Sequence, residues 1–258
     1  MRLLAVSATL ALVGCTRDAP EPNPPEAEGA VVAAALAAWN QRLAGVRDYA
    51  VEGEVKDLGS NEILHFRYAM QQPAFSAGEL LDAQGARQRA FVFDGKQLAV
   101  VDEGSKTLTR QDLSADEEQM LFTLHEIFSQ FVCEGWRPPL IKPQGSTGVR
   151  EGDRLVLTVP IVDDNLSSQR LTLRDSGAFV KKELLGKAGQ VVAQTSVLED
   201  VVDDATKLTF PRRWSHSEGG STQEVTLTKI AVNQGVDAAR FSTALPPGFT
   251  LGLLQAAR

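Results

Sequence analysis

The chain has 258 residues, of which 43% are hydrophobic and 23% charged, a composition typical of globular rather than disordered proteins. Its net charge of −7 argues against nucleic acid or an anionic lipid surface as the main partner. The two cysteines are Cys15 and Cys133. Since the first belongs to a processing signal, no internal disulfide is expected in the mature chain.

Residues 1–14 are predicted to be a lipoprotein signal peptide. One basic residue precedes an apolar run that is too short to span a bilayer. The run ends in Leu12-Val13-Gly14-Cys15, which resembles the lipobox of bacterial lipoproteins, whose cysteine is acylated and becomes the new N-terminus. We therefore predict lipidation of Cys15 and a membrane anchor formed by its acyl chains. The alternative is an ordinary signal peptide that happens to contain a cysteine.

The residue after Cys15 favours the outer membrane. Thr16 stands where enterobacterial lipoproteins that stay at the inner membrane carry aspartate. Residues 15–28 then contain four prolines mixed with glutamates, which predicts an extended tether between the anchor and the rest of the chain. Residues 29–258 are expected to form a single domain that faces the periplasm.

A helix is predicted over residues 27–46, because alanines accompany an apolar stripe at helical spacing, namely Val32, Leu36, Trp39 and Leu43. From Tyr49 the hydrophobic pattern has a period of two, as in β-strands. Leu64, Phe66, Tyr68 and Met70 share one face of a strand. Further strands are predicted at 75–82, 87–93, 98–102, 106–111, 155–161, 169–174, 178–185, 190–198, 207–217 and 222–232. Asp94-Gly95 and Glu218-Gly219-Gly220 have the composition of hairpin turns.

One strongly helical segment interrupts the strands, from Ser114 to about Cys133. Ser114 and Glu117 form a capping box, and an apolar stripe follows. An apolar helix among about eleven strands favours one curved antiparallel sheet wrapped around it over a two-layer sandwich. The predicted fold class is therefore α+β, mainly β, with helices on the concave side of the sheet.

Two segments resemble the LolA-like carriers of bacterial lipoproteins. Phe93-Asp94-Gly95-Lys96-Gln97-Leu98 resembles a hairpin of that family. Residues 234–241, QGVDAARF, followed by Pro246-Pro247-Gly248, are similar to its closing segment. The order of the predicted elements also fits from about residue 30 to 250. The resemblance implies an incomplete β-barrel covered by helices, with an apolar cavity that holds the acyl chains of a passenger lipoprotein.

The expected cavity lining follows from the periodicity of the strands and of the central helix. It comprises Leu64, Phe66, Tyr68, Met70, Phe91, Phe93 and Leu157 from strands, with Leu121, Leu124 and Phe128 from the helix. The same pattern is equally typical of a packed core. An open cavity and a filled interior are therefore both consistent with these residues.

The sequence departs from the family at two positions. LolA-type carriers have an Arg-Pro pair whose arginine bonds to the covering helix, whereas this chain has Gln72-Pro73. Glutamine lacks the charged, five-donor guanidinium group. Cys15 is the second departure, because LolA is soluble whereas this chain is predicted to be tethered, as LolB is.

The sequence predicts no catalytic residue, metal site or cofactor. His125-Glu126 begins like a zinc-binding helix, but Ser129 stands where the second ligand would be. Cys133 is expected to be a buried, inert thiol. The remaining candidates are interpreted as ordinary polar positions and solvated turns: His65, His216, Asp163-Asp164 and Asp203-Asp204. The predicted function is binding of the acyl chains of lipids or lipoproteins. The alternative is an envelope sensor or protein-interaction module with a filled core.

Overall fold

The computed structural model describes residues 28–72, 74–113, 127–129, 131–136, 144–161 and 165–252. Within these residues the strands form one fourteen-stranded sheet, in the order β14-β6-β5-β4-β3-β2-β1-β13-β12-β11-β10-β9-β8-β7. Adjacent strands pair antiparallel, except that β14 pairs with β6 in parallel. The chain therefore runs outward from β1 to β6, crosses to the opposite end of the sheet at β7, and returns inward to β13, which pairs with β1.

The strands are β1 (Asp48–Asp57), β2 (Ile63–Gln71), β3 (Phe75–Leu81), β4 (Arg87–Asp94), β5 (Gln97–Asp102), β6 (Thr107–Asp112), β7 (Thr147–Glu151), β8 (Arg154–Pro160), β9 (Leu166–Arg174), β10 (Phe179–Gly186), β11 (Val191–Val202), β12 (Thr209–Glu218), β13 (Ser221–Val232) and β14 (Thr250–Leu251). The helices are α1 (Glu28–Ala44) and the 3-10 turns η1 (Glu134–Trp136) and η2 (Ala238–Phe241). The predicted strands are confirmed; the change of period at Tyr49 marks β1, for which no bounds were predicted, and β7 and β14 were not predicted.

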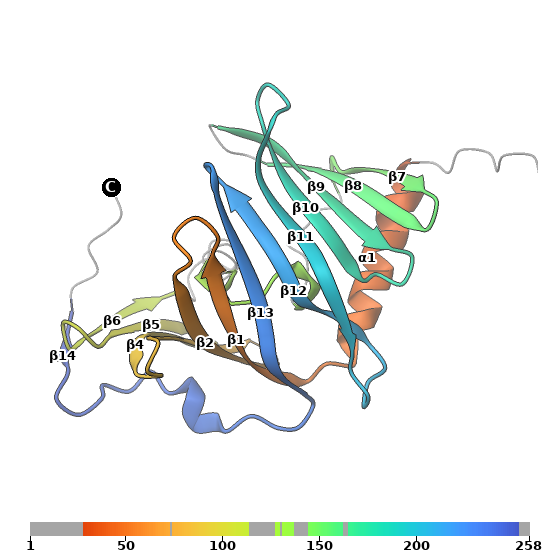
Figure 1. Ribbon diagram of the computed structural model, residues 1–258. Helices are drawn as coiled ribbons and strands as arrows, with labels where there is room; N and C mark the ends of the chain where they lie inside the picture. The colour runs from red at the N-terminus through yellow and green to blue at the C-terminus, as the bar shows by residue number, and fades with distance from the viewer. Residues whose placement is uncertain are drawn as a thin grey trace, which may run out of the picture.

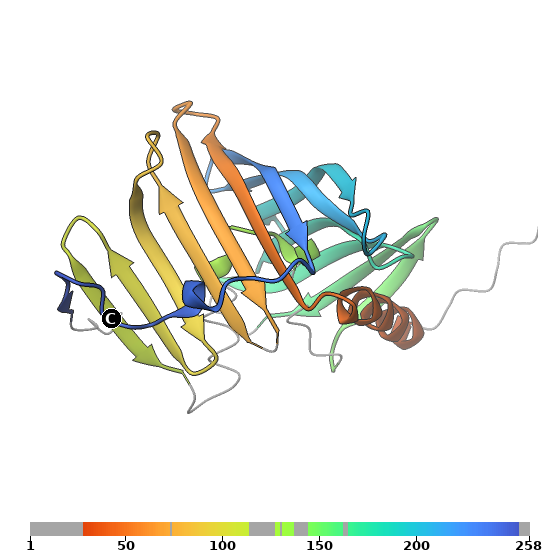
Figure 2. The ribbon, with the colours of Figure 1, turned by 90° about the horizontal axis from the view of Figure 1, so that it is seen from below.

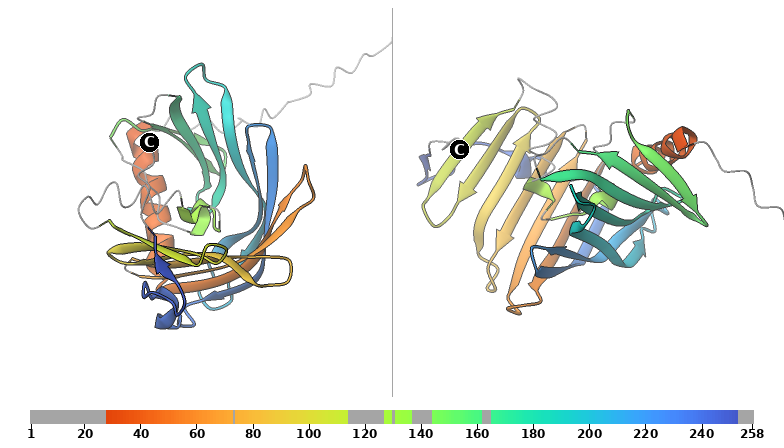
Figure 3. Two further views of the ribbon diagram at one scale, coloured as in Figure 1. Left: turned by 90° about the vertical axis from the view of Figure 1, so that its left-hand side faces the viewer. Right: turned by 90° about the horizontal axis from the view of Figure 1, so that it is seen from above.

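The sheet curves strongly but does not close, because β14 and β7 at its two ends do not pair with each other. Figure 1 and Figure 3 show the two halves of the sheet facing each other as an open half-barrel. The expected single curved sheet is thus confirmed.

Helix α1 packs on the β7 end of the sheet, where it contacts β7 and β8. Its buried residues are Val31, Val32, Ala35, Trp39 and Leu43. Gly177, in the turn between β9 and β10, allows α1 to approach this turn closely, since a Cβ there would lie 2.7 Å from the carbonyl carbon of Ala38. Nowhere in the described part of the chain is a helix both long and apolar enough to cross a membrane.

The predicted helix at 114–133 lies mostly outside the described residues. Residues 127 and 128 are helical, but 131–133 are not, so the prediction was wrong at its C-terminal end. The 3-10 turn η1 follows instead. The reason is local packing, because Phe131, Val132 and Cys133 are all buried, and three consecutive residues do not share one face of a helix.

The C-terminal segment crosses the convex face of the sheet, as Figure 2 shows, over a row of small residues. Ala69, Ala77 and Ala99 belong to this row, and Phe241 packs on it. The hydroxyl of Thr243 donates to the carboxylate of Asp94 across 3.0 Å. This bond joins the closing segment to the β4–β5 hairpin, the two segments on which the sequence resemblance rests.

Candidate functional site: the concave interior

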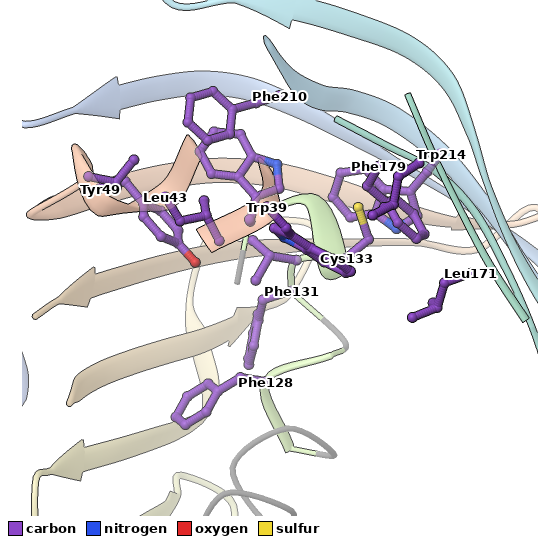
Figure 4. Close-up of a cluster of buried hydrophobic side chains, with 14 of the residues drawn as sticks. Trp39, Leu43, Tyr49, Phe128, Phe131, Cys133, Leu171, Phe179, Phe210 and Trp214 are labelled. Atoms are coloured by element: carbon purple, nitrogen blue, oxygen red, sulfur yellow. The ribbon is translucent and has the colours of Figure 1, made fainter. Parts of the chain in front are cut away.

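The structure brings most of the predicted lining residues into one apolar cluster on the concave face. Phe66, Tyr68, Phe93, Phe128 and Leu157 are buried in it, and Met70 and Phe91 pack against it while partly exposed. They come from β2, β4, β8 and the segment before η1, which are far apart in the sequence. Figure 4 shows part of this cluster.

Leu64 lies outside this cluster. It lies on the same face of β2 as Phe66, but it is 40% exposed. It stands next to the first residue of the strand, opposite Val55, near the tip of the β1–β2 hairpin. The alternation therefore predicted its face correctly, but the cluster does not extend to the end of the strand. Leu121 and Leu124 lie outside the described residues.

A short stretch of chain lies inside the curve of the sheet, as the left view of Figure 3 shows for η1. We call Phe128 and residues 131–136 the inner segment. Phe128, Phe131, Val132, Cys133, Glu134, Gly135 and Trp136 are all buried. The described part of the interior is consequently occupied by the chain's own side chains.

Phe131 is the aromatic centre of the inner segment. Its ring stacks on Tyr68, with centroids 5.7 Å apart and planes 14° apart. It also lies 5.8 Å from the ring of Phe66 and 6.1 Å from that of Phe91. Such contacts stabilise by about 0.5–1.5 kcal/mol each beyond the burial of area.

A glycine in β3 makes room for this ring. Gly78 is paired with Tyr68 on one side and with Phe91 on the other. A Cβ on Gly78 would lie 2.4 Å from an atom of the Phe131 ring, which is too close for real atoms. We call the position bounded by Gly78, Tyr68, Phe91 and Phe66, and occupied by Phe131, the aromatic seat.

The other end of the inner segment is held by polar bonds, and the first comes from helix α1. Arg42 is 6% exposed and donates from Nη1 to the carbonyl oxygen of Gly135 across 2.8 Å and from Nη2 to that of Thr209. Its guanidinium carbon lies 4.7 Å from the ring centroid of Phe210. One side chain thus links α1, η1 and β12.

Burial lowers the pKa of Arg42 to about 10, and electrostatic interactions with Cys133 and Asp200 oppose that shift. This value is well above neutral, so the guanidinium stays charged. A buried charge requires hydrogen-bond partners, and the two carbonyl groups supply them. Arg42 therefore stays bonded to the carbonyl oxygens of Gly135 and Thr209 while water is excluded from the interior.

Two further bonds hold η1. The carboxylate of Glu134 accepts from the Lys182 ammonium across 2.5 Å, and both side chains are largely buried. The indole N–H of Trp136 donates to the carbonyl oxygen of Pro211 across 2.8 Å. The Trp136 ring stacks on Phe210 at 4.3 Å. Residues 134–136 are therefore fixed to β10 and β12.

Gln72, which stands where LolA-type carriers have arginine, forms its hydrogen bond elsewhere. Its side-chain amide donates to the carbonyl oxygen of Val46, at the α1–β1 connection, across 2.7 Å. Arg42 makes the bond to the inner segment instead, and the sequence analysis did not identify it. A signal was present, since Arg42 follows Trp39 by three residues on the buried side of α1.

Several of the other candidate residues that the structure describes are buried or make hydrogen bonds within the fold. Cys133 is buried as a thiol, and His216 shares a hydrogen bond of 3.0 Å with Thr195. Asp203 caps its own turn by accepting from the backbone N–H of Thr206. His125 and Asp163-Asp164 lie outside the described residues. No three histidine, cysteine or acidic residues that the structure describes come together as metal ligands.

The fold is LolA-like. A LolA superfamily protein from Nitrosomonas europaea superimposes with a TM-score of 0.53 at 11% identity, over 84% of this chain and 98% of its own. A DUF1329 family protein from Desulfovibrio piger gives 0.60 at 11% identity, over 86% and 100%. A putative outer membrane lipoprotein-sorting protein domain from Vibrio parahaemolyticus gives 0.56 at 11%, over 81% and 97%. No family model and no curated protein matches the sequence.

Proposed function

We propose that this protein is an acylated lipoprotein of the bacterial outer membrane that binds the acyl chains of lipids or lipoproteins in its concave interior. The observation that carries the proposal is the single apolar cluster that Phe66, Tyr68, Phe93, Phe128 and Leu157 form inside a LolA-like half-barrel. Burial of a hydrocarbon chain there would contribute about 25 cal/mol per Å² of apolar surface.

Lipid binding is tested on the full chain, purified from the envelope in a non-acyl detergent. Native mass spectrometry and extraction are expected to show lipid bound in addition to the covalent anchor. A fluorescent palmitate analogue should compete with that lipid. Protein that carries no extractable lipid and does not bind the analogue would exclude the proposal.

The anchor is tested separately by growth with radiolabelled palmitate. The full chain should incorporate label, and a Cys15→Ser variant should not. Fractionation should place the labelled protein in the outer membrane. An unlabelled chain would remove the anchor from the proposal without affecting the interior.

The dense packing of the inner segment favours a second candidate, an envelope protein-interaction module whose interior stays filled. Phe131 and Trp136 are both fully buried, as expected for a permanent core. This candidate predicts no exchangeable lipid and a defined protein partner at fixed stoichiometry. The palmitate competition therefore distinguishes the two.

A further inference from the structure

We propose that the aromatic seat is the subsite that receives an acyl chain, and that the Phe131 side chain occupies it until the chain enters. This inference rests on the proposed function, from which it takes the class of ligand. It adds the place where that ligand binds and the residue that it displaces.

The first argument is the glycine. A glycine inside a strand weakens the strand and often marks a close approach by another group. Here it lies between two aromatic residues, in the row Val51–Tyr68–Gly78–Phe91–Val100 across neighbouring strands. The missing side chain leaves a trough between aromatic walls, one residue wide on the concave face. Its width suits a planar ring or a polymethylene chain.

The second argument is the nature of the contacts. Phe131 meets Tyr68, Phe66, Phe91 and Phe128 through ring contacts. A methylene chain offers the same dispersion and the same removal of apolar surface from water. An acyl chain could therefore replace the ring without leaving a buried polar group unsatisfied. The seat stays filled in both states, so the free protein carries no open cavity there.

The third argument is the contrast with the rest of the inner segment. Glu134, Gly135 and Trp136 are each held by a hydrogen bond to Lys182, Arg42 or Pro211. Displacing them would leave buried donors and acceptors unpaired, which is costly. Phe131 lies three residues earlier, and three residues span up to about 10 Å when extended. Phe131 can therefore leave the seat while η1 remains in place.

Two substitutions in the seat have opposite expected effects on the binding of a fluorescent palmitate analogue to the full chain. Phe131→Ala removes the competing side chain, so affinity should rise about tenfold, which corresponds to ~1.4 kcal/mol. Gly78→Ala places a methyl group in the trough and should lower affinity about tenfold. In the double variant the methyl group should cancel most of the gain.

Phe241→Ala is the matched control. Phe241 is 6% exposed and packs on the convex face of the sheet, outside the concave interior. The same truncation there should leave the affinity within about twofold of the unaltered chain. Circular dichroism establishes that each variant is folded, and Phe131→Leu, which retains more of the apolar volume, replaces Phe131→Ala if that variant unfolds. An equal rise for Phe241→Ala and Phe131→Ala would overturn the inference.

Photochemistry on the unaltered chain provides a test that needs no variant. A palmitate with a diazirine in its chain should label peptides that contain Phe66, Tyr68 or Phe91. If the unaltered chain binds the analogue but the label lies elsewhere and neither seat variant changes affinity, the seat is not the subsite, while the proposed function stands. If neither the unaltered chain nor any variant binds the analogue, both the proposed function and the assignment of the seat are wrong.

Discussion

The guanidinium group of Arg42 lies 2.8 Å from the carbonyl oxygen of Gly135, ninety-three residues away in the chain. The bond connects the last turn of α1 to the segment inside the half-barrel. Arg42 also binds the carbonyl oxygen of Thr209, so it holds α1, the inner segment and β12 together.

Replacing Arg42 should destabilise the protein. Arg42→Met leaves two buried carbonyl groups without their donor, and the free energy of unfolding should fall by about 2–4 kcal/mol. Arg42→Lys keeps the charge but not the fork geometry, so its loss should be about half as large. Denaturant unfolding followed by tryptophan fluorescence measures both, because Trp39, Trp136 and Trp214 are all buried. A lysine variant as stable as the original would contradict the two-carbonyl role.

Glu134 and Lys182 should show strong coupling. Removing one partner leaves the other charge largely buried and unpaired, and Glu134→Gln or Lys182→Met should each cost about 2–4 kcal/mol. The double variant should cost less than the sum, with a coupling energy of about 1–3 kcal/mol. A double-mutant cycle by denaturant unfolding gives this value. The exposed pair Lys229–Glu52 is the control, and its coupling should be below about 1 kcal/mol.

The carboxylate of Asp94 should make stability depend on pH. Burial raises its pKa, but the backbone N–H groups of Gln97 and Lys96 and the Thr243 hydroxyl outweigh this, so the pKa is lowered. Because the pKa of Asp94 is lower in the folded chain than its value of about 3.9 in the unfolded chain, the ionised carboxylate stabilises the fold at any pH above that value. This stabilisation is lost as the pH falls through the folded pKa.

Asp94→Ala should therefore reduce stability by about 1–2 kcal/mol at neutral pH, and the gap to the unaltered chain should close below about pH 4. Thermal unfolding of both proteins at several pH values measures the gap. Comparing the two cancels the contributions of Asp57, Asp102 and Glu103, whose pKa values are also lowered. A gap that does not change with pH would contradict this role.

Gly177 should tolerate substitution much less well than Gly189. Both have positive φ, +76° and +80°, in turns that flank β10. A Cβ at Gly189 meets open space, whereas one at Gly177 meets the backbone of Ala38 in α1. Gly189→Ala should cost about 1 kcal/mol, from the backbone conformation alone. Gly177→Ala should cost roughly 2 kcal/mol more, because α1 must move. Equal losses in denaturant unfolding would mean that α1 does not dock on this turn.

Sequence patterns predicted the elements whose cause is local. The turn at Asp94-Gly95 forms as predicted because glycine adopts φ of +92° there and Asp94 accepts from the next backbone N–H groups. The two-residue strand β14 was missed because its pairing with Thr107 and Leu108 depends on residues far away in the chain. Arg42 was missed for a similar reason, since a charged residue on a buried helix face is explained only by the carbonyl groups that meet it.

The sequence by itself determined which side chains share a face, because alternation along a strand and the period of a helix are properties of neighbouring residues. Phe66, Tyr68 and Phe93 were assigned to the interior on this basis. Only the tertiary structure decided what that interior contains. The Gly78 trough and the position of Phe131 arise from curvature of the sheet and from pairings such as Tyr49 with Val232. Those contacts join distant parts of the chain, and no local pattern encodes them.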